Sequence, residues 1–532
     1  MPDPNFELLN PSSLEPLGGL LQPHGDDAND GEEDLDLSGT GRHFVWLNLP
    51  SAVSLIASIF LLSYSVRKIG TVAYGGVVTI SSTIAILTLF SGALRYAVVR
   101  SGSRLNDRPE RGSDETKSDR EEVLAAHSTF VAAALVILVI AAGLGWLIPL
   151  DLHMTGPSAL QTYVATIVYV GASCVGISVM SYSAVLTGRE QFGTVAKIAV
   201  VGIAVQIAGT LLLVDRYRII GLALAALAAA IVEAGLTYVI GHRRFPWLSL
   251  IPHRPERSVA SGVLRYAAGI AILSATATIC ASSDAFIIGA FRNGASVTIF
   301  KVGVVAPTGL VVFLYSSSAV LFPRLARSSN RDRQEDAVGQ MGRISGWIAG
   351  WVFASLCLLS NDVVRLLLGH DNPQASQVLW ICSAALMVDV SYHGIIQVIY
   401  ARGQQGFLAK YSWIELVFNL AATCVLVRQF GPVGSAWALA ATIVLTDLVG
   451  FPIIMRGRWG SSAGRFVIRH GVLQSLAAAA LTIVIGIGPF VATKGFQVHL
   501  AILVVTGVVV LATGVLLAGS QSRSQIWRLV KA

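Results

Sequence analysis

The chain has 532 residues, of which 54% are hydrophobic and only 13% are charged. Soluble globular proteins carry about 25% charged residues, so this composition excludes that class and indicates a polytopic membrane protein. The five cysteines lie inside apolar runs and form no CxxC pair, so we expect no disulfide framework, metal or cofactor. The net charge of +7 comes from basic residues dispersed among loops, so we also expect no nucleic-acid partner.

The first 41 residues form an acidic tail with ten Asp or Glu and no Lys or Arg. A segment with so few apolar residues buries too little surface to fold, so we expect a disordered tail. It has no basic region followed by an apolar core, and we therefore expect no cleaved signal peptide.

Apolar segments long enough to span a bilayer follow the tail. About 20 apolar residues cross the hydrocarbon core as an α-helix. By this rule we predict an all-α fold of about fourteen transmembrane helices, at residues 44–66, 74–97, 125–149, 158–186, 194–214, 219–241, 264–290, 296–322, 344–368, 376–401, 408–427, 433–455, 467–491 and 499–519.

The distribution of Lys and Arg predicts the orientation of these helices. With a cytoplasmic N-terminus, 28 of the 38 basic residues fall in cytoplasmic loops, tails and helix ends. Because positive loops stay inside, we expect both termini to be cytoplasmic and the protein to lie in the inner or plasma membrane.

Residues 189–235 recur at 402–448 without a gap, with thirteen identities in 47 positions. The offset corresponds to six helices, an even number, so the copies have the same orientation and define two parallel six-helix lobes. We predict a tail at 1–41, an N-terminal lobe at 42–242, a cytoplasmic linker at 243–263, a C-terminal lobe at 264–457, and two further helices with a short tail at 458–532.

Short motifs are distributed through residues 42–460: Ile69-Gly70 with Tyr74-Gly75, Ala93-Leu94 with Arg100, Asp284 to Gly289, Leu321 to Arg324, and Leu367 to Gly369. Together they resemble motifs of the polysaccharide flippases, which share a superfamily with the multidrug and toxin extrusion antiporters. Arg95 is displaced from the usual position of the second motif. The resemblance implies transfer of a polyprenyl-pyrophosphate-linked oligosaccharide from the inner to the outer leaflet, for capsule, exopolysaccharide or O-antigen assembly.

Ionisable residues inside predicted spans are costly, so each one needs a partner, water or a function. In the tenth helix, Asp389 and His393 begin a polar stripe that continues to Gln397 and Tyr400, while the eleventh carries Tyr411, Glu415, Asn419 and Thr423. A carboxylate beside an imidazole suits proton coupling, and a buried pair that only ties helices together fits equally well. We expect ion coupling, by H⁺ or Na⁺, in the C-terminal lobe.

Further charges suggest other pairings. Asp284 and Lys301 have similar depths, which predicts a structural ion pair, or a gate in which Lys301 exchanges Asp284 for phosphate. Asp447 and Glu233 occupy nearly equivalent repeat positions and could face each other between the lobes. Arg95 reaches deeper than a predicted cytoplasmic rim for headgroup capture, although simple anchoring also explains the rim; its residues are Arg189, Lys197, Arg402 and Lys410.

The leading hypothesis is therefore a flippase for lipid-linked oligosaccharide that works by alternating access, among membrane lipids and beside a polysaccharide polymerase and glycosyltransferases. A cation-coupled multidrug antiporter and a peptidoglycan lipid-precursor flippase stay open as alternatives. A membrane glycosyltransferase is less favoured, because the chain has no large extramembrane catalytic region and no Gly-rich phosphate motif, His/Cys metal spacing or GxSxG. We therefore expect a protein that is not an enzyme.

Overall fold

The computed structural model of the chain describes residues 37–105, 113–252, 256–319, 331–401, 405–454 and 468–517. Within these ranges the chain is helical and contains no β-strand. Most of the predicted acidic tail lies outside the described residues, and the first helix begins at Leu37, five residues before the predicted boundary.

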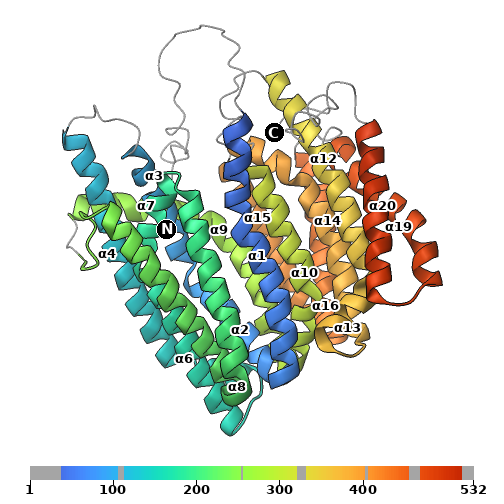
Figure 1. Cartoon of the computed structure of the whole chain (residues 1–532), viewed down its shortest axis with the longest axis horizontal. Helices are drawn as coiled ribbons and strands as arrows, with labels where there is room; N and C mark the ends of the chain where they lie inside the picture. The colour runs from blue at the N-terminus through green and yellow to red at the C-terminus, as the bar shows by residue number, and fades with distance from the viewer. Residues whose placement is uncertain are drawn as a thin grey trace, which may run out of the picture.

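Eight helices form the N-terminal half; in Figure 1, α4, α6 and α8 lie on the left and α1 runs along the middle. They are α1 (Leu37–Ile69), α2 (Thr71–Leu87), α3 (Leu89–Arg104), α4 (Ser113–Leu144), α5 (Leu147–Asp151), α6 (Pro157–Ser178), α7 (Met180–Gly188) and α8 (Phe192–Arg244). Between the second and third predicted spans, 74–97 and 125–149, the described residues are helical almost throughout, because α3 continues to Arg104 and α4 already begins at Ser113.

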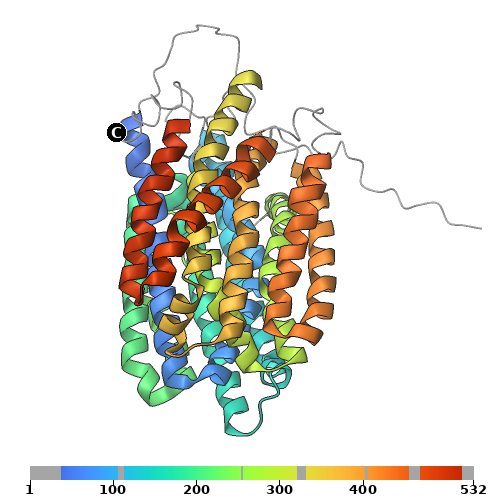
Figure 2. The ribbon, with the colours of Figure 1, turned by 90° about the vertical axis from the view of Figure 1, so that its right-hand side faces the viewer.

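The C-terminal half packs beside it. It contains α9 (Arg257–Phe291), α10 (Gly294–Ala319), α12 (Arg331–Leu358), α13 (Ser360–Leu368), α14 (Pro373–Ala401), α15 (Gln405–Phe430), α16 (Pro432–Ile443) and the π-helix η3 (Val444–Gly450). After η4 (Ile468–Val472), the helices α19 (Leu473–Ala492) and α20 (Phe496–Leu517) pack on the outside of α12, as Figure 2 shows.

Ten helices in the described ranges are long and apolar enough to cross a membrane, or up to twelve if each of two bent pairs is one span. The bent pairs are α2 with α3, at 47°, and α12 with α13, at 63°. The 53-residue α8 contains two helices joined at a kink at Arg218. The predicted count of about fourteen stays a prediction, although every predicted segment overlaps a helix or a bent pair.

The internal repeat has the same local geometry in both copies. The kink residue Arg218 has φ 50° and ψ −123°, and Gly431, 213 residues later, has φ 61° and ψ −138°. Three residues beyond each turn, Gly221 and Gly434 pack so closely on the carbonyl of Leu213 or Leu426 that no Cβ would fit. The sequence repeat is therefore a structural repeat of one helical hairpin.

Helices α1 and α9 each contact helices of both halves. α1 packs along α8 and along α10, and its Leu62 and Val66 share a core cluster with Val302 of α10. The first half of α9 packs against α3 and α4, whereas its later part contacts α15 and α16. The lobe boundaries predicted from the sequence stay a prediction. Helix packing couples the lobes through α1 and α9, and also where α2 packs on α10.

Candidate functional site

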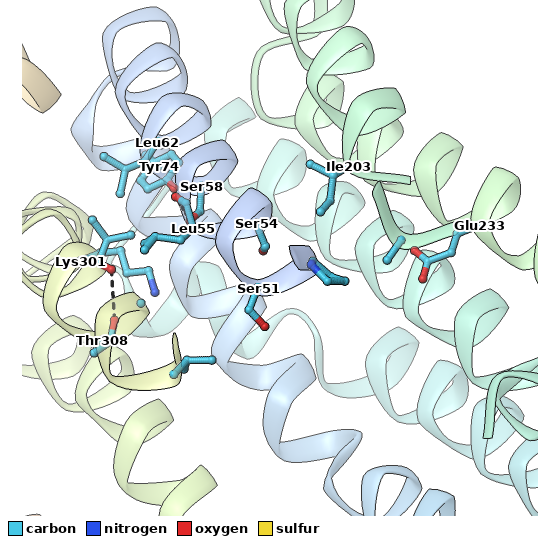
Figure 3. Close-up of a pocket in the computed structure, with 15 residues that line it drawn as sticks. Ser51, Ser54, Leu55, Ser58, Leu62, Tyr74, Ile203, Glu233, Lys301 and Thr308 are labelled. Carbon is cyan, nitrogen blue, oxygen red and sulfur yellow. Dashed lines mark hydrogen bonds between the residues drawn. The ribbon is translucent and has the colours of Figure 1, made fainter. Parts of the chain in front are cut away.

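A cavity of about 530 Å³ lies between the two halves, lined by residues of α1, α2, α8 and α10. Its polar lining comes from Ser51, Ser54, Ser58, Tyr74, Glu233, Lys301 and Thr308. In Figure 3, Lys301 and Glu233 lie on opposite sides, with the serines of α1 between them. The cavity is thus bounded by both lobes and carries one charge of each sign.

The serines of α1 form one face of the helix, because Ser51, Ser54 and Ser58 follow one another at steps of three and four. Hydroxyl groups donate and accept hydrogen bonds, so this face is suited to a polar ligand rich in hydroxyls. Sequence analysis missed these residues, and their regular spacing after Pro50 in an apolar segment was the signal that could have found them.

Lys301 of α10 presents its amino group to the cavity. Within the described residues it makes no ion pair and no hydrogen bond with another side chain, so the predicted pair with Asp284 does not form. Asp284 of α9 instead accepts a hydrogen bond from Ser435 Oγ of α16 at 2.6 Å. The two residues have similar depth, but they face different neighbours, and Lys301 is left available to an anion.

Glu233 lies on the opposite wall, where its Oε2 is 2.9 Å from the position that a Cβ on Gly202 would take. The positive charge of Arg95 on α3 acts on this carboxylate, and Arg95 also donates to Thr187 Oγ1 at 3.4 Å. Arg95 does not line the cavity, and its electrostatic partner is an acid of the cavity wall.

The C-terminal lobe gathers three of the predicted acids: Asp389 of α14, Glu415 of α15 and Asp447 of η3. Asp389 accepts a hydrogen bond from the hydroxyl of Tyr315, and the charges of Asp389 and Glu415 both act on Asp447. The two polar stripes predicted on the tenth and eleventh helices therefore meet through Asp389 and Glu415. The side chain of His393 lies outside the described residues, so its pairing with Asp389 stays a prediction.

The buried polar atoms of the described part of this lobe that have no hydrogen-bond partner include Asn419 Oδ1 and Asp447 Oδ2. The Asn419 amide donates to Thr442 Oγ1 at 3.3 Å. A π-helix adds a residue to the helical turn, which displaces Asp447 relative to the α-helical position of Glu233 in the other repeat copy. Asp447 and Glu233 do not share a site, because Glu233 lines the cavity whereas Asp447 lies near Asp389 and Glu415 in the C-terminal lobe. No group of three or more His, Cys, Asp or Glu in the described ranges forms a metal site.

The predicted cytoplasmic rim is described for three of its four residues, since Arg402 lies outside the described residues. Arg189 stacks over the ring of Phe245 at 4.9 Å, and Lys197 lies 5.6 Å from the ring of Trp46, whereas Lys410 is exposed. Burial, together with the nearby charge of Arg120, lowers the pKa of Arg189. The three described residues of the rim thus have different surroundings, and the rim as a whole stays a prediction.

Two apolar helical halves around a polar cavity define a multi-pass membrane protein with a transporter fold. The chain is similar in structure to "Lipid II flippase MurJ, inward closed conformation", with a TM-score of 0.66 and 13% identity over 92% of this chain and 100% of that chain. It is also similar to an inward-facing multidrug resistance MATE family transporter of the MOP superfamily, with a TM-score of 0.61 and 13% identity over 79% of this chain and 95% of that one.

The chain belongs to the polysaccharide biosynthesis protein family, whose sequence profile matches residues 41–329. It is 24% identical over 170 residues to the "Probable low-salt glycan biosynthesis flippase Agl15" of Haloferax volcanii. This match spans 31% of the chain and 36% of that relative. The resemblance drawn from the short motifs is thereby confirmed at the level of the family.

Proposed function

We propose that this chain is a flippase that moves a polyprenyl-pyrophosphate-linked oligosaccharide from the inner to the outer leaflet for polysaccharide biosynthesis. The observation that carries the proposal is the amino group of Lys301, which faces a cavity between the lobes and has no acidic partner in the described part of the chain. An unpaired cation at this depth is costly, and a phosphate group would offset that cost. The family and the flippase named among its relatives support the same substrate class.

The remaining polar lining fits the other part of such a substrate. The serine face of α1 and the carboxylate of Glu233 offer hydrogen bonds to sugar hydroxyls, opposite the cation that would hold the diphosphate. The cavity holds only part of a lipid-linked oligosaccharide at one time, so the lipid tail would stay in the bilayer. We place the protein in the plasma membrane with both termini cytoplasmic, in accord with the distribution of Lys and Arg.

Coupling would come from the acids of the C-terminal lobe. Asp389, Glu415 and Asp447 act on one another electrostatically, so binding H⁺ or Na⁺ at one of them changes the charge felt by the others. Because α14 and α10 pack together, and Tyr315 of α10 donates to Asp389, a change at Asp389 reaches the helix that carries Lys301.

A peptidoglycan lipid-precursor flippase is the second candidate, favoured by the structural similarity that covers 92% of this chain. Its substrate also bears a diphosphate, so Lys301 serves both. A multidrug antiporter fits less well, since a cationic drug would meet Lys301 in the same cavity as Glu233.

Transfer of fluorescent glycolipids in proteoliposomes, with and without a proton gradient, tests the proposal. Leaflet exposure is read with a membrane-impermeant quencher, using a polyprenyl-diphosphate oligosaccharide, a peptidoglycan lipid precursor and a cationic dye as separate cargoes. We expect Lys301→Ala to slow transfer of the oligosaccharide about 10- to 100-fold, as expected for a lost charge-assisted hydrogen bond of about 1.5 to 3 kcal/mol. Asp389→Asn should remove only the stimulation by the gradient.

Lys301→Arg, which retains the positive charge, should transfer cargo at close to the wild-type rate. Lys68→Ala is the matched control. Lys68 lies at the C-terminal end of α1, does not line the cavity, and pairs with Asp215 at 2.9 Å. Unchanged transfer by Lys301→Ala would refute the role of the cavity cation. Transport of the dye alone would refute the glycolipid substrate.

A further inference from the structure

Three arginines gather at one end of the N-terminal lobe, and each one stacks on an aromatic ring. Arg100 of α3 lies 5.0 Å from the Tyr266 ring, Arg120 of α4 lies 5.6 Å from the Trp247 ring, and Arg189, in the turn before α8, lies 4.9 Å from the Phe245 ring. We call these three arginines and three rings the arginine shelf. Its rings come from the segment that joins the lobes and from the start of α9.

The shelf is a built feature of the fold. Gly188 of α7 packs against the backbone of Val99 and Ser103 so closely that no Cβ would fit there, which brings the Arg189 turn next to α3. The rings of Phe245 and Trp247 lie 6.4 Å apart, and all three rings pack on the same hydrophobic core. Three cations are therefore held close together on one apolar support.

Within the residues that the structure describes, two of these arginines have a buried donor that no protein atom accepts from. Arg100 Nε and Arg189 Nε are buried and have no hydrogen-bond partner. In the part of the chain that the structure describes, none of the three arginines forms an ion pair, and the neighbouring Glu122 instead accepts from Ser101 Oγ at 2.6 Å. Burial and the charge of Arg120 lower the pKa of Arg189, as expected where like charges meet without an anion.

Ordinary anchoring of a membrane protein does not require this arrangement. An anchoring arginine keeps its guanidinium in water at the headgroup level, as the exposed Arg243 and Arg244 do at the end of α8. Arg120 is exposed as well, whereas Arg100 and Arg189 are half-buried and each has a buried Nε. A guanidinium whose face is stacked on a ring still presents its N–H edge, and that edge matches two oxygens of a phosphate.

We propose that the arginine shelf binds the phosphate of a membrane lipid at the entrance to the N-terminal lobe. The depth is suitable, because Arg120 lies three residues inside the span that begins at Lys117, and Arg100 lies in the last turns of α3. Basic sites between transmembrane helices on the cytoplasmic side bind lipid headgroups in this way. The phosphate can belong to an anionic phospholipid or to the diphosphate of the carrier, and the second source rests on the proposed function.

Lipid binding to the full-length chain in detergent, followed by native mass spectrometry, tests this proposal. The probes are phosphatidylglycerol, undecaprenyl diphosphate and, as a zwitterionic comparison, phosphatidylcholine. We expect Arg120→Gln combined with Arg189→Gln to weaken binding of an anionic probe at least tenfold. Arg189→Lys, which keeps the charge without the planar fork, should weaken it less. The matched control is Arg243→Gln combined with Arg244→Gln, which should bind as the wild type does.

The pattern of loss identifies the ligand. A loss confined to undecaprenyl diphosphate assigns the shelf to the carrier, and a loss confined to phosphatidylglycerol assigns it to a phospholipid. Loss with both assigns it to lipid phosphates in general. Binding of both probes within twofold of the wild type by the Arg120 and Arg189 variants overturns the proposal, with the milder Arg189→Lys deciding if the double variant does not fold. Because no transfer is measured, a chain that binds through the shelf and moves no glycolipid would refute the proposed function alone.

Discussion

Arg218 occupies a backbone conformation that suits glycine. Its φ of 50° with ψ −123° lies in a region where a side chain is strained, and its repeat counterpart at the same turn is Gly431. Gly156, before α6, has a similar conformation, with φ 63° and ψ −142°. Two of these three turns have glycine at the strained position. Only the turn at Arg218 carries the steric cost of a side chain.

Replacing Arg218 with Gly should stabilise the protein by about 1 kcal/mol. Glycine relieves the backbone strain in the folded state, and this gain exceeds the loss of stability from the greater conformational entropy of the unfolded chain. The free energy of unfolding in a mild denaturing detergent, or the thermal midpoint, measures this. Gly431→Arg is the reciprocal variant and should destabilise by a similar amount. If Arg218→Gly lowered stability, the turn would not be strained by its side chain.

Asp151, at the end of α5, is a half-buried carboxylate outside the predicted spans. Its Oδ2 has no hydrogen-bond partner among the described residues and packs directly on Gly289 of α9. Burial raises the pKa of Asp151 to about 6, above its value of about 3.9 in an unfolded chain. The folded state therefore holds this proton more tightly, and stability contributed by the neutral form is lost as the pH rises from about 4 through 6.

Asp151→Asn should thus gain stability relative to the wild type as the pH rises through this window, reaching about 1 to 2 kcal/mol above pH 7 after allowance for the partial exposure of the group. Thermal midpoints at pH 4.5 and pH 7.5 measure the difference. Asp371→Asn, at an exposed carboxylate 4.0 Å from Arg365, is the control and should show no such gain. An equal effect of Asp151→Asn at both pH values would contradict the assignment.

At the scale of elements, the sequence predicted which residues share a helix face, and the structure decided what each face meets. The stripes that begin at Asp389 and Tyr411 were recognised from spacing, and their acids do come together. The pair of Asp284 with Lys301 was predicted from depth alone, and Asp284 binds Ser435 instead. Depth follows from the rise of 1.5 Å per residue, but the direction of a side chain around its helix depends on how that helix packs.

The π-helix η3 shows a second limit of the sequence. The gapless repeat left Asp447 one residue out of register with Glu233. In the structure, the shift in register coincides with a difference between the copies: the second copy is π-helical from Val444 to Gly450, and the first is α-helical there. A π-turn has no distinctive composition, so a pattern built on α-helical periodicity could not predict it.

At the scale of the whole molecule, the halves meet closely at the end that carries the short loops. Gly75 of α2 and the backbone of Gly294 of α10 leave no room for a Cβ, and Thr298 Oγ1 donates to the Thr71 carbonyl at 2.5 Å. Gly289 meets Asp151 at the same end. A transporter that alternates access must open such a contact in one of its states.

Gly75→Ala should therefore shift the protein toward a form in which this end is open, since the added methyl cannot coexist with the Gly294 backbone. The measurement is the rate at which a membrane-impermeant maleimide labels Thr298→Cys, in a background without the five native cysteines. We expect the rate to rise several-fold with Gly75→Ala. Gly92→Ala, at a glycine with open space around it, is the control and should leave the rate unchanged. If Thr298→Cys were labelled at the same rate with and without Gly75→Ala, the contact would not restrain this end.

The sequence by itself determined the membrane class, the apolar segments, the parallel repeat and the family, because these depend on composition, length and periodicity along the chain. Only the tertiary structure decided which charges share a space. Lys301 faces Glu233 across a cavity while Asp284 binds Ser435, and the arginine shelf draws its residues from α3, α4, the turn before α8 and the joining segment. Contacts between distant segments are set by how helices pack, and a sequence carries that information only jointly over the whole chain.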